Sequence, residues 1–184
     1  MMSLKSKITV KVLNYYFLNQ KTRRYVNELA GILDVDAGNL HRKLKEMERE
    51  GVLTGENQGN QKYYSLNKNY PLLAEFKKIF ESKQGLPALI KKKLDGLGGL
   101  REAYIFGSYP KGSMDGESDI DLLLVGVHSP LGAEKRLLSL QKTLGRQINI
   151  INMSGDELDA ARKKKDPFIE NIFSRKNIKL AINV

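Results

Sequence analysis

Apolar residues recur at helical intervals through the first part of the chain. Residues 6–19, 25–33 and 37–50 carry them every three or four positions, which predicts three amphipathic helices. The buried face of the third helix is predicted to consist of Leu40, Leu44 and Met47. Asp36 precedes this helix as an expected N-cap, and Gly51 follows it as an expected stop.

The pattern changes to short strands after residue 51. Residues 52–54 and 62–66 are predicted strands, and the Gly-, Asn- and Gln-rich segment 55–61 between them predicts a β-hairpin with a glycine-rich tip. A further amphipathic helix is predicted over residues 71–80, because proline is favoured in a first helical turn. We expect this helix to connect two domains or to form a dimer contact.

Buried strands and helices alternate in the second half of the chain. Residues 103–106 and 120–127 are apolar runs of strand length, and residues 178–182 form a last predicted strand. Helices are predicted over residues 133–144 and 166–173. A chain of this length has room for two small domains or one larger one.

Polar residues stand beside the two longest of these strands. Gly107 and Ser108 follow the first strand, and Asp119 and Asp121 open the second. Because strand side chains alternate with a period of two, both carboxylates are expected on one face, where a cation relieves their repulsion. Hard oxygen ligands favour Mg²⁺, with Mn²⁺ as a substitute. The glycine turn and the Ser108 hydroxyl offer a complementary place for phosphate oxygens.

This spacing of Gly-Ser and Asp-x-Asp resembles the nucleotidyltransferase fold of the DNA polymerase beta-like superfamily, and in particular the small prokaryotic minimal nucleotidyltransferases. The resemblance covers roughly residues 85–184. It implies a Mg²⁺-dependent site that takes a nucleoside triphosphate as substrate or ligand. Asp119 and Asp121 would be catalytic and hold the metal. The residues that would bind the nucleotide are Gly107, Ser108, Lys111, Gly112 and Ser118.

One position departs from the pattern that the resemblance implies. Active members of the superfamily carry a third carboxylate on the strand after the helix at 133–144, where it completes a two-metal site. The matching position in this chain is Asn149, and no acidic residue occurs between positions 146 and 155. A neutral amide oxygen can ligate a cation without offsetting its charge. The sequence therefore leaves open whether the domain transfers a nucleotide or only binds one.

Residues 6–67 resemble the winged helix-turn-helix domains of ArsR- or MarR-like regulators. A short helix, a three-residue turn and a helix with basic residues near its start are typical of such domains, as is the hairpin that follows. The resemblance implies binding of duplex DNA by the third helix and the hairpin. The candidate contacts are Asn39, His41, Arg42, Lys43, Lys45 and Lys62.

The chain is thus predicted to be an α+β protein. A winged helix-turn-helix domain is expected in residues 1–70, a connecting helix in 71–84, and a nucleotidyltransferase-fold α/β domain with a mixed sheet in 85–184.

The amino-acid composition limits which partners and which chemistry are expected of the chain. The formal net charge of +10 favours a polyanionic partner, and it divides equally, with +5 in residues 1–82 and +5 in residues 83–184. The absence of cysteine excludes disulfides and a thiol nucleophile. Lysines interrupt the apolar residues near the N-terminus, and no apolar run approaches the ~20 residues of a membrane span. We expect a soluble, cytoplasmic protein without a membrane partner.

Two hypotheses of different classes follow. In the first, the chain is a DNA-binding transcriptional regulator, and its nucleotidyltransferase-like domain binds Mg-NTP with weak or partner-dependent transfer. In the second, it is an active enzyme that transfers NMP to a hydroxyl of a protein or small molecule, with an autoregulatory DNA-binding domain. The resemblance supplies a concrete form of the second, an antitoxin that adenylylates a HEPN-type toxin. A homodimer is expected because winged-helix regulators commonly bind two half-sites.

Overall fold

A computed structural model describes residues 5–114 and 118–182 of the chain. The backbone divides into two compact units, one formed by residues 1–86 with 142–145 and the other by residues 87–141 with 146–184. Each unit is described by itself below.

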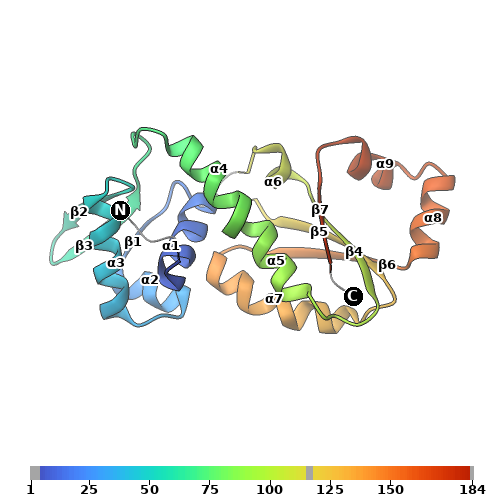
Figure 1. Ribbon diagram of the computed structural model, residues 1–184, viewed down its shortest axis with the longest axis horizontal. Helices are drawn as coiled ribbons and strands as arrows, with labels where there is room; N and C mark the ends of the chain where they lie inside the picture. Colours follow the sequence, from blue (N-terminus) through green and yellow to red (C-terminus); the bar gives the residue numbers. More distant parts are fainter. Residues whose placement is uncertain (1–4, 115–117, 183–184) are drawn as a thin grey trace. The chain divides into compact units, whose positions relative to one another are not determined.

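The described residues of the first unit form four helices and three short strands (Figure 1). Its elements are α1 (Lys7–Leu18), β1 (Arg23–Tyr25), α2 (Val26–Leu33), α3 (Ala37–Arg49), β2 (Leu53–Gln58), β3 (Gln61–Leu66) and α4 (Leu73–Gln84). The three strands form an antiparallel sheet in the order β1-β3-β2. β1 is absent from the sequence expectations because its three residues are polar or aromatic and show no alternation.

The core of the first unit forms where the three helices and the sheet meet. Leu40, Leu44 and Met47 of α3 are fully buried, as the helical spacing predicted. The Asp36 side chain caps α3 by accepting a hydrogen bond of 2.8 Å from the Asn39 backbone N–H. A side chain of α1 also links the core to β3. A hydrogen bond of 2.8 Å runs from the buried Tyr16 hydroxyl to the Tyr64 carbonyl.

The hairpin formed by β2 and β3 is longer than the sequence pattern predicted. Its register continues to the pair Gln58–Gln61, which leaves a turn of only Gly59 and Asn60. Gly59 adopts a φ of 58°, a conformation that two-residue hairpin turns require and glycine adopts at little cost. The residues of β2 beyond Leu53 are polar and mostly exposed, so no apolar alternation marked this part of the strand.

The second unit is built on a four-stranded sheet in the order β6-β5-β4-β7. Its elements are α5 (Leu86–Leu94), β4 (Leu100–Phe106), α6 (Ser108–Lys111), β5 (Ile120–Gly126), α7 (Pro130–Leu144), β6 (Ile148–Met153), α8 (Gly155–Lys163), α9 (Pro167–Ser174) and β7 (Ile178–Leu180). β5 and β6 run parallel, whereas β4 pairs antiparallel with both β5 and β7. The chain is therefore an α+β protein with a mixed sheet, as predicted.

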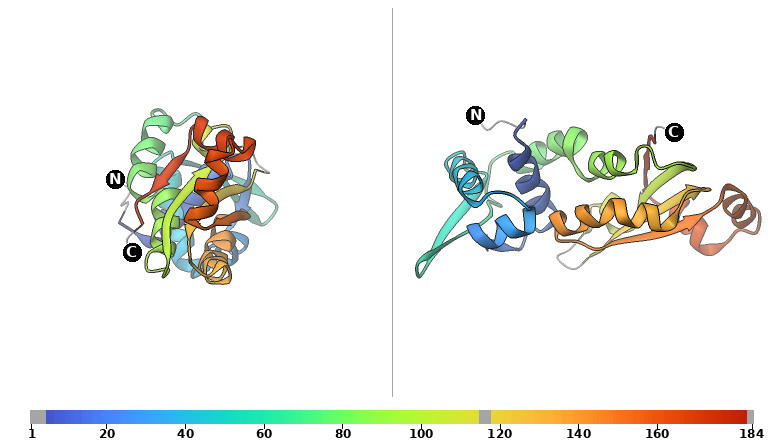
Figure 2. Two further views of the ribbon diagram at one scale, coloured as in Figure 1. Left: turned by 90° about the vertical axis from the view of Figure 1, so that its right-hand side faces the viewer. Right: turned by 90° about the horizontal axis from the view of Figure 1, so that it is seen from below.

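Strand alternation gives this sheet two different faces. One face carries Tyr104, Leu123 and Val125 and packs against residues of α8 and α9. The opposite face carries buried residues such as Ile120 and Leu122, which alternate with the first set. In Figure 2, α8 and α9 lie apart from α7.

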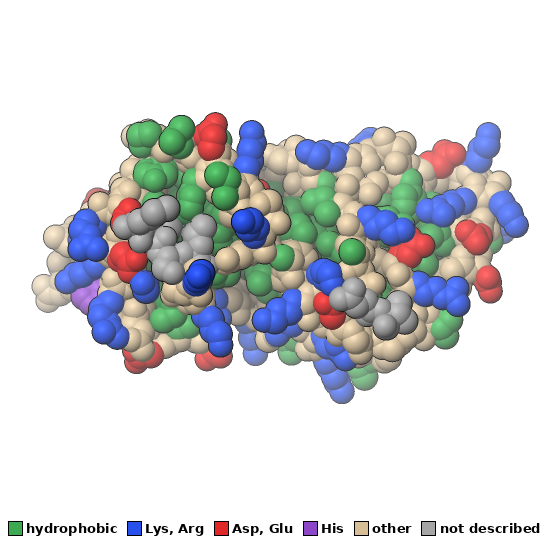
Figure 3. All heavy atoms as spheres, viewed as in Figure 1, with side chains coloured by type: hydrophobic (Ala, Val, Ile, Leu, Met, Phe, Trp, Pro, Cys, Tyr) green, Lys and Arg blue, Asp and Glu red, His purple; other side chains and the backbone are tan. Residues whose placement is uncertain are grey.

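Lysine and arginine side chains occur over both units on the surface shown in Figure 3 and do not gather in one patch. This distribution agrees with the equal division of charge along the sequence. Among the described residues, no helix combines the length and the apolar character that crossing a bilayer requires.

Candidate functional site

Asp119, Asp121 and Asn149 meet at one end of the parallel strand pair. Asp121 on β5 is the register partner of Asn149 on β6, and Asp119 lies two residues earlier on the same side of the chain. The Asn149 Nδ2 group donates to Asp119 Oδ2 at 3.2 Å and to Asp121 Oδ1 at 3.3 Å. All three side chains are half-buried. The three residues that the sequence singled out as catalytic therefore form one cluster.

This donor set fits a single hard cation. Two carboxylate oxygens converge on one nitrogen atom, so the amide group of Asn149 takes the place between them that a cation would fill. The Asn149 Oδ1 atom accepts a hydrogen bond of 3.2 Å from Gln147 Nε2, which holds the amide in this orientation. Within residues 5–114 and 118–182, no group of three acidic or histidine side chains is placed to bind a metal.

Gly107 is required at its position for two separate reasons. Its φ of 80° lies in the region that side-chain-bearing residues rarely adopt. A Cβ atom added there would also lie 2.2 Å from Asp121 Oδ2, well inside contact distance. The glycine therefore lets the backbone after β4 pass directly beside the carboxylate.

The remaining predicted nucleotide-binding residues surround the short helix α6. Gly107 precedes it, Ser108 is its first residue and Lys111 its last, and Gly112 ends it with a φ of 72°. The Ser113 backbone N–H donates to the Ser108 carbonyl at 3.2 Å, which closes the turn. The glycine at each end thus holds the Ser108 and Lys111 side chains on a tight turn beside Asp121.

A buried arginine fixes the backbone that leads into the carboxylates. Arg146 is 6% exposed, and its Nη1 group donates to the Ser118 carbonyl at 2.9 Å. The Ile120 backbone N–H donates to the Gln147 carbonyl at 2.9 Å, so the segment is held from both ends. Sequence reasoning missed Arg146, because an arginine in a polar turn carries no periodic signal of burial.

The family model described as "Polymerase beta, Nucleotidyltransferase" matches residues 89–180. The chain belongs to this nucleotidyltransferase family. Residues 89–180, called the nucleotidyltransferase domain below, include the whole cluster from β4 to β6. No curated protein matches the sequence.

Two solved structures are similar to part of the chain. A toxin-antitoxin crystallised with AMP-PNP is 20% identical, with a TM-score of 0.40, and the match covers 53% of this chain and 74% of that one. A protein from Sulfolobus solfataricus, described as a candidate nucleotidyltransferase, is 24% identical with a TM-score of 0.27. That match covers 41% of this chain and 72% of the other.

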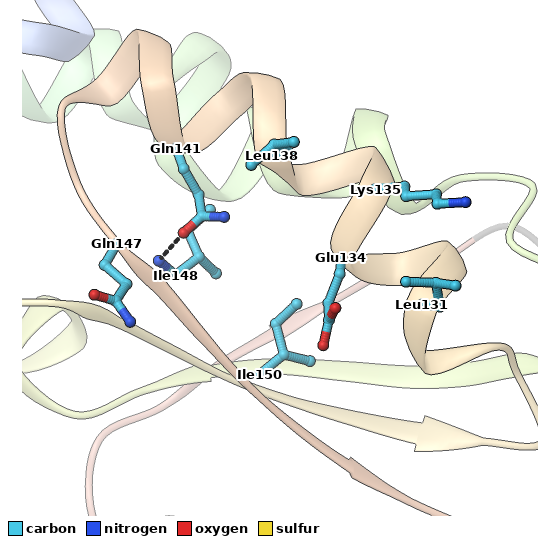
Figure 4. Close-up of a pocket in the computed structure, with 8 residues that line it drawn as sticks. All are labelled: Leu131, Glu134, Lys135, Leu138, Gln141, Gln147, Ile148 and Ile150. Carbon is cyan, nitrogen blue, oxygen red and sulfur yellow. Dashed lines mark hydrogen bonds between the residues drawn. The ribbon is translucent and has the colours of Figure 1, made fainter.

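The nucleotidyltransferase domain has a hollow on the face of its sheet opposite the carboxylates. It has a volume of about 410 Å³ and lies between α7 and β6 (Figure 4). Ile148 and Ile150 line it, and these residues alternate with Asn149 and so point away from the carboxylates. Gln141 Oε1 accepts a hydrogen bond of 2.8 Å from the Ile148 backbone N–H at its edge. This hollow contains none of the predicted site residues.

Some of the candidate DNA contacts of the first unit are exposed, whereas others pair with an acidic side chain. Asn39, Arg42 and Lys45 are exposed on α3, and Arg42 donates to the Asn39 side chain. His41 is half-buried. Lys43, also half-buried, pairs with Glu46 at 2.5 Å.

Lys62, the candidate contact on the hairpin, also pairs with an acidic side chain. Lys62 Nζ lies 2.7 Å from Glu48 Oε2, and this hydrogen bond raises the pKa of Lys62. Arg49 is a further exposed cation of α3, and it borders a shallow hollow together with Arg42 and Lys45. Sequence reasoning missed Arg49, although its spacing of seven residues from Arg42 places both on one helix face.

Replacement of Gly107 by alanine tests the close approach to Asp121. We expect Gly107→Ala to lower the unfolding free energy by about 2 kcal/mol through backbone strain and further through the clash of the added Cβ with Asp121, and to remove nucleotide binding because Asp121 must move. The matched control is Gly96→Ala, since Gly96 has a φ of 71° but nothing within 4 Å of an added Cβ. Urea unfolding and Mg-NTP thermal shifts measure both effects. Equal behaviour of the two variants would contradict this role for Gly107.

Proposed function

We propose that this chain is a DNA-binding transcriptional regulator whose nucleotidyltransferase domain binds a nucleoside triphosphate with one divalent cation. The observation that carries the proposal is the position of the Asn149 amide between Asp119 and Asp121. Two carboxylates suffice for one Mg²⁺, or Mn²⁺ in its place. A neutral amide at the third position does not offset the charge of a second metal.

Different residues of the cluster would bind the cation and the phosphate groups. Asp119 and Asp121 would hold the cation, which when bound neutralises charge on the triphosphate oxygens. Rotation of the Asn149 side chain would turn its Oδ1 atom toward that cation. The Ser108 hydroxyl and the Lys111 ammonium group would contact phosphate oxygens, which Gly107 allows to approach the backbone closely.

The first unit supports the DNA-binding part of the proposal. Helix α2, the three-residue turn 34–36, helix α3 and the hairpin of β2 and β3 follow one another in the order expected of a winged helix-turn-helix domain. α3 would enter the major groove with Asn39 and Arg42 toward base edges, and Lys45 and the hairpin would contact phosphates. Lys43 and Lys62 must exchange their glutamate partners for phosphate to take part.

Nucleotide binding through the carboxylates is tested by thermal unfolding. In the wild type, Mg²⁺ and NTP at a hundredfold excess over Kd should stabilise the fold by about 2.7 kcal/mol. Asp119→Asn combined with Asp121→Asn should abolish this shift. Without ligand, the double variant should be as stable as the wild type or more so, because the repulsion between the carboxylates is removed.

The control is Asp156→Asn combined with Asp159→Asn, an equal change of charge at exposed positions of α8. This control should retain the full ligand-induced shift. An undiminished shift in the Asp119 and Asp121 variant would place the nucleotide elsewhere and refute the proposed site.

A further inference from the structure

A small hollow opens beside the carboxylate cluster, between β4, α6 and α9. Its volume is about 120 Å³, and Gly107 forms part of its wall. Phe106 and Phe168 line it with their rings edge to face, 6.0 Å between centroids. Phe106 is the register partner of Asp121, so the hollow adjoins Asp121 on the β4 side, whereas Asn149 adjoins it on the β6 side.

Cationic side chains dominate the lining of this hollow. Lys111 at the end of α6 and Arg175 and Lys176 after α9 all border it, and none of the acidic residues that the structure describes does. Within the described residues, no carboxylate forms an ion pair with any of these three cations. The charge of the lining therefore favours an anionic ligand.

The backbone that carries two of these cations is held in place. Asn177 Nδ2 donates to the Ile172 carbonyl at 3.1 Å and to the Arg175 carbonyl at 3.2 Å. These bonds satisfy carbonyls at the end of α9 and fix the direction in which the chain leaves the helix. Arg175 and Lys176 thus project from an ordered turn beside the hollow.

We propose that this hollow binds the terminal phosphates of the nucleotide, and that Arg175 and Lys176 contact them directly, so that part of the affinity for phosphate does not require the metal. The inference rests on the proposed nucleotide-binding function and adds to it two residues that follow α9. Hydrogen bonds from these cations to phosphate oxygens are charge-assisted and therefore stronger than bonds between neutral groups. The Asn149 amide hydrogens offset part of the negative charge of the aspartates, so an anion is tolerated nearby without a cation.

The test uses inorganic tripolyphosphate as the probe, titrated calorimetrically into the full chain in EDTA. We expect binding to the wild type and about tenfold weaker binding for each cation removed in Arg175→Gln and Lys176→Gln, as for other charge-assisted contacts. Lys176→Arg should retain affinity because the charge remains. The control is Lys163→Gln with Lys164→Gln, exposed lysines at the end of α8, which should bind normally.

The design separates this inference from the proposed function. Asp119→Asn with Asp121→Asn should retain tripolyphosphate binding in EDTA while losing the Mg-NTP shift. Normal tripolyphosphate affinity in the Arg175 and Lys176 variants, with the Mg-NTP result as expected, would overturn the inference alone. Absence of tripolyphosphate binding to the wild type in EDTA would also overturn it. Absence of Mg-NTP binding to the wild type would refute the proposed function, whether or not tripolyphosphate binds.

Discussion

Asn149→Asp is expected to tighten Mg²⁺ binding with at most modest NMP transfer. If the domain is instead an enzyme limited by a weak second metal, transfer should rise by ~10–1000-fold, the range over which a well-placed electrostatic group acts. The substitution replaces the amide that now lies 3.2 Å from Asp119 and 3.3 Å from Asp121 with a third carboxylate. Without metal, the variant should unfold more easily than the wild type because three carboxylates repel one another. Added Mg²⁺ should reverse that loss.

Calorimetric Mg²⁺ titration beside a transfer assay with labelled NTP distinguishes the outcomes. Tighter metal binding without product supports a regulator that only binds nucleotide. Product already formed by the wild type would favour the alternative hypothesis, NMP transfer to a protein or small-molecule hydroxyl, and a HEPN-type partner is the acceptor to include. The control is Asn60→Asp at the exposed hairpin tip. Unchanged Mg²⁺ affinity in Asn149→Asp would mean that this side chain does not face the cation.

The parts of the fold that hydrophobic spacing governs could be predicted from the sequence. The buried face of α3 follows from Leu40, Leu44 and Met47 alone. The helix expected to open at Pro71 instead begins at Leu73, because Leu72 adopts a φ of 65° and turns the chain there. Such a turn depends on the backbone geometry of one residue, which no apolar pattern records.

The candidate site divides in the same way. Strand alternation was enough to place Asp119 and Asp121 together, because a period of two holds in any sheet. The family resemblance pointed to Asn149, and the parallel pairing of β5 with β6 in the structure places its side chain beside the aspartates. Arg146, Arg175 and Lys176 approach the site through tertiary packing between segments distant in sequence, and no local spacing encodes that.

Binding of the first unit to duplex DNA should fall steeply with salt. Neutralisation of ~4–6 phosphates by α3 and the hairpin gives a slope of log affinity against log salt of roughly −4 to −5 per protomer. Between 50 and 200 mM salt, affinity should therefore fall by about 250- to 1000-fold. Fluorescence anisotropy with DNA from the chain's own promoter, measured over that range, gives the slope directly.

Variants that each replace one basic residue show which side chains contribute to the salt dependence and to sequence discrimination. Lys45→Ala removes an exposed cation of α3 and should make the slope shallower by about one, whereas Lys163→Ala on α8 should leave it unchanged. Arg42→Ala should weaken binding and also reduce discrimination between sequences, because it is expected to reach base edges.

Two half-sites would require a homodimer, so sedimentation of the free protein at micromolar concentration should give twice the chain mass. A salt-independent affinity would refute DNA binding through α3, and a monomeric mass would refute the dimer, because each rests on a separate physical requirement.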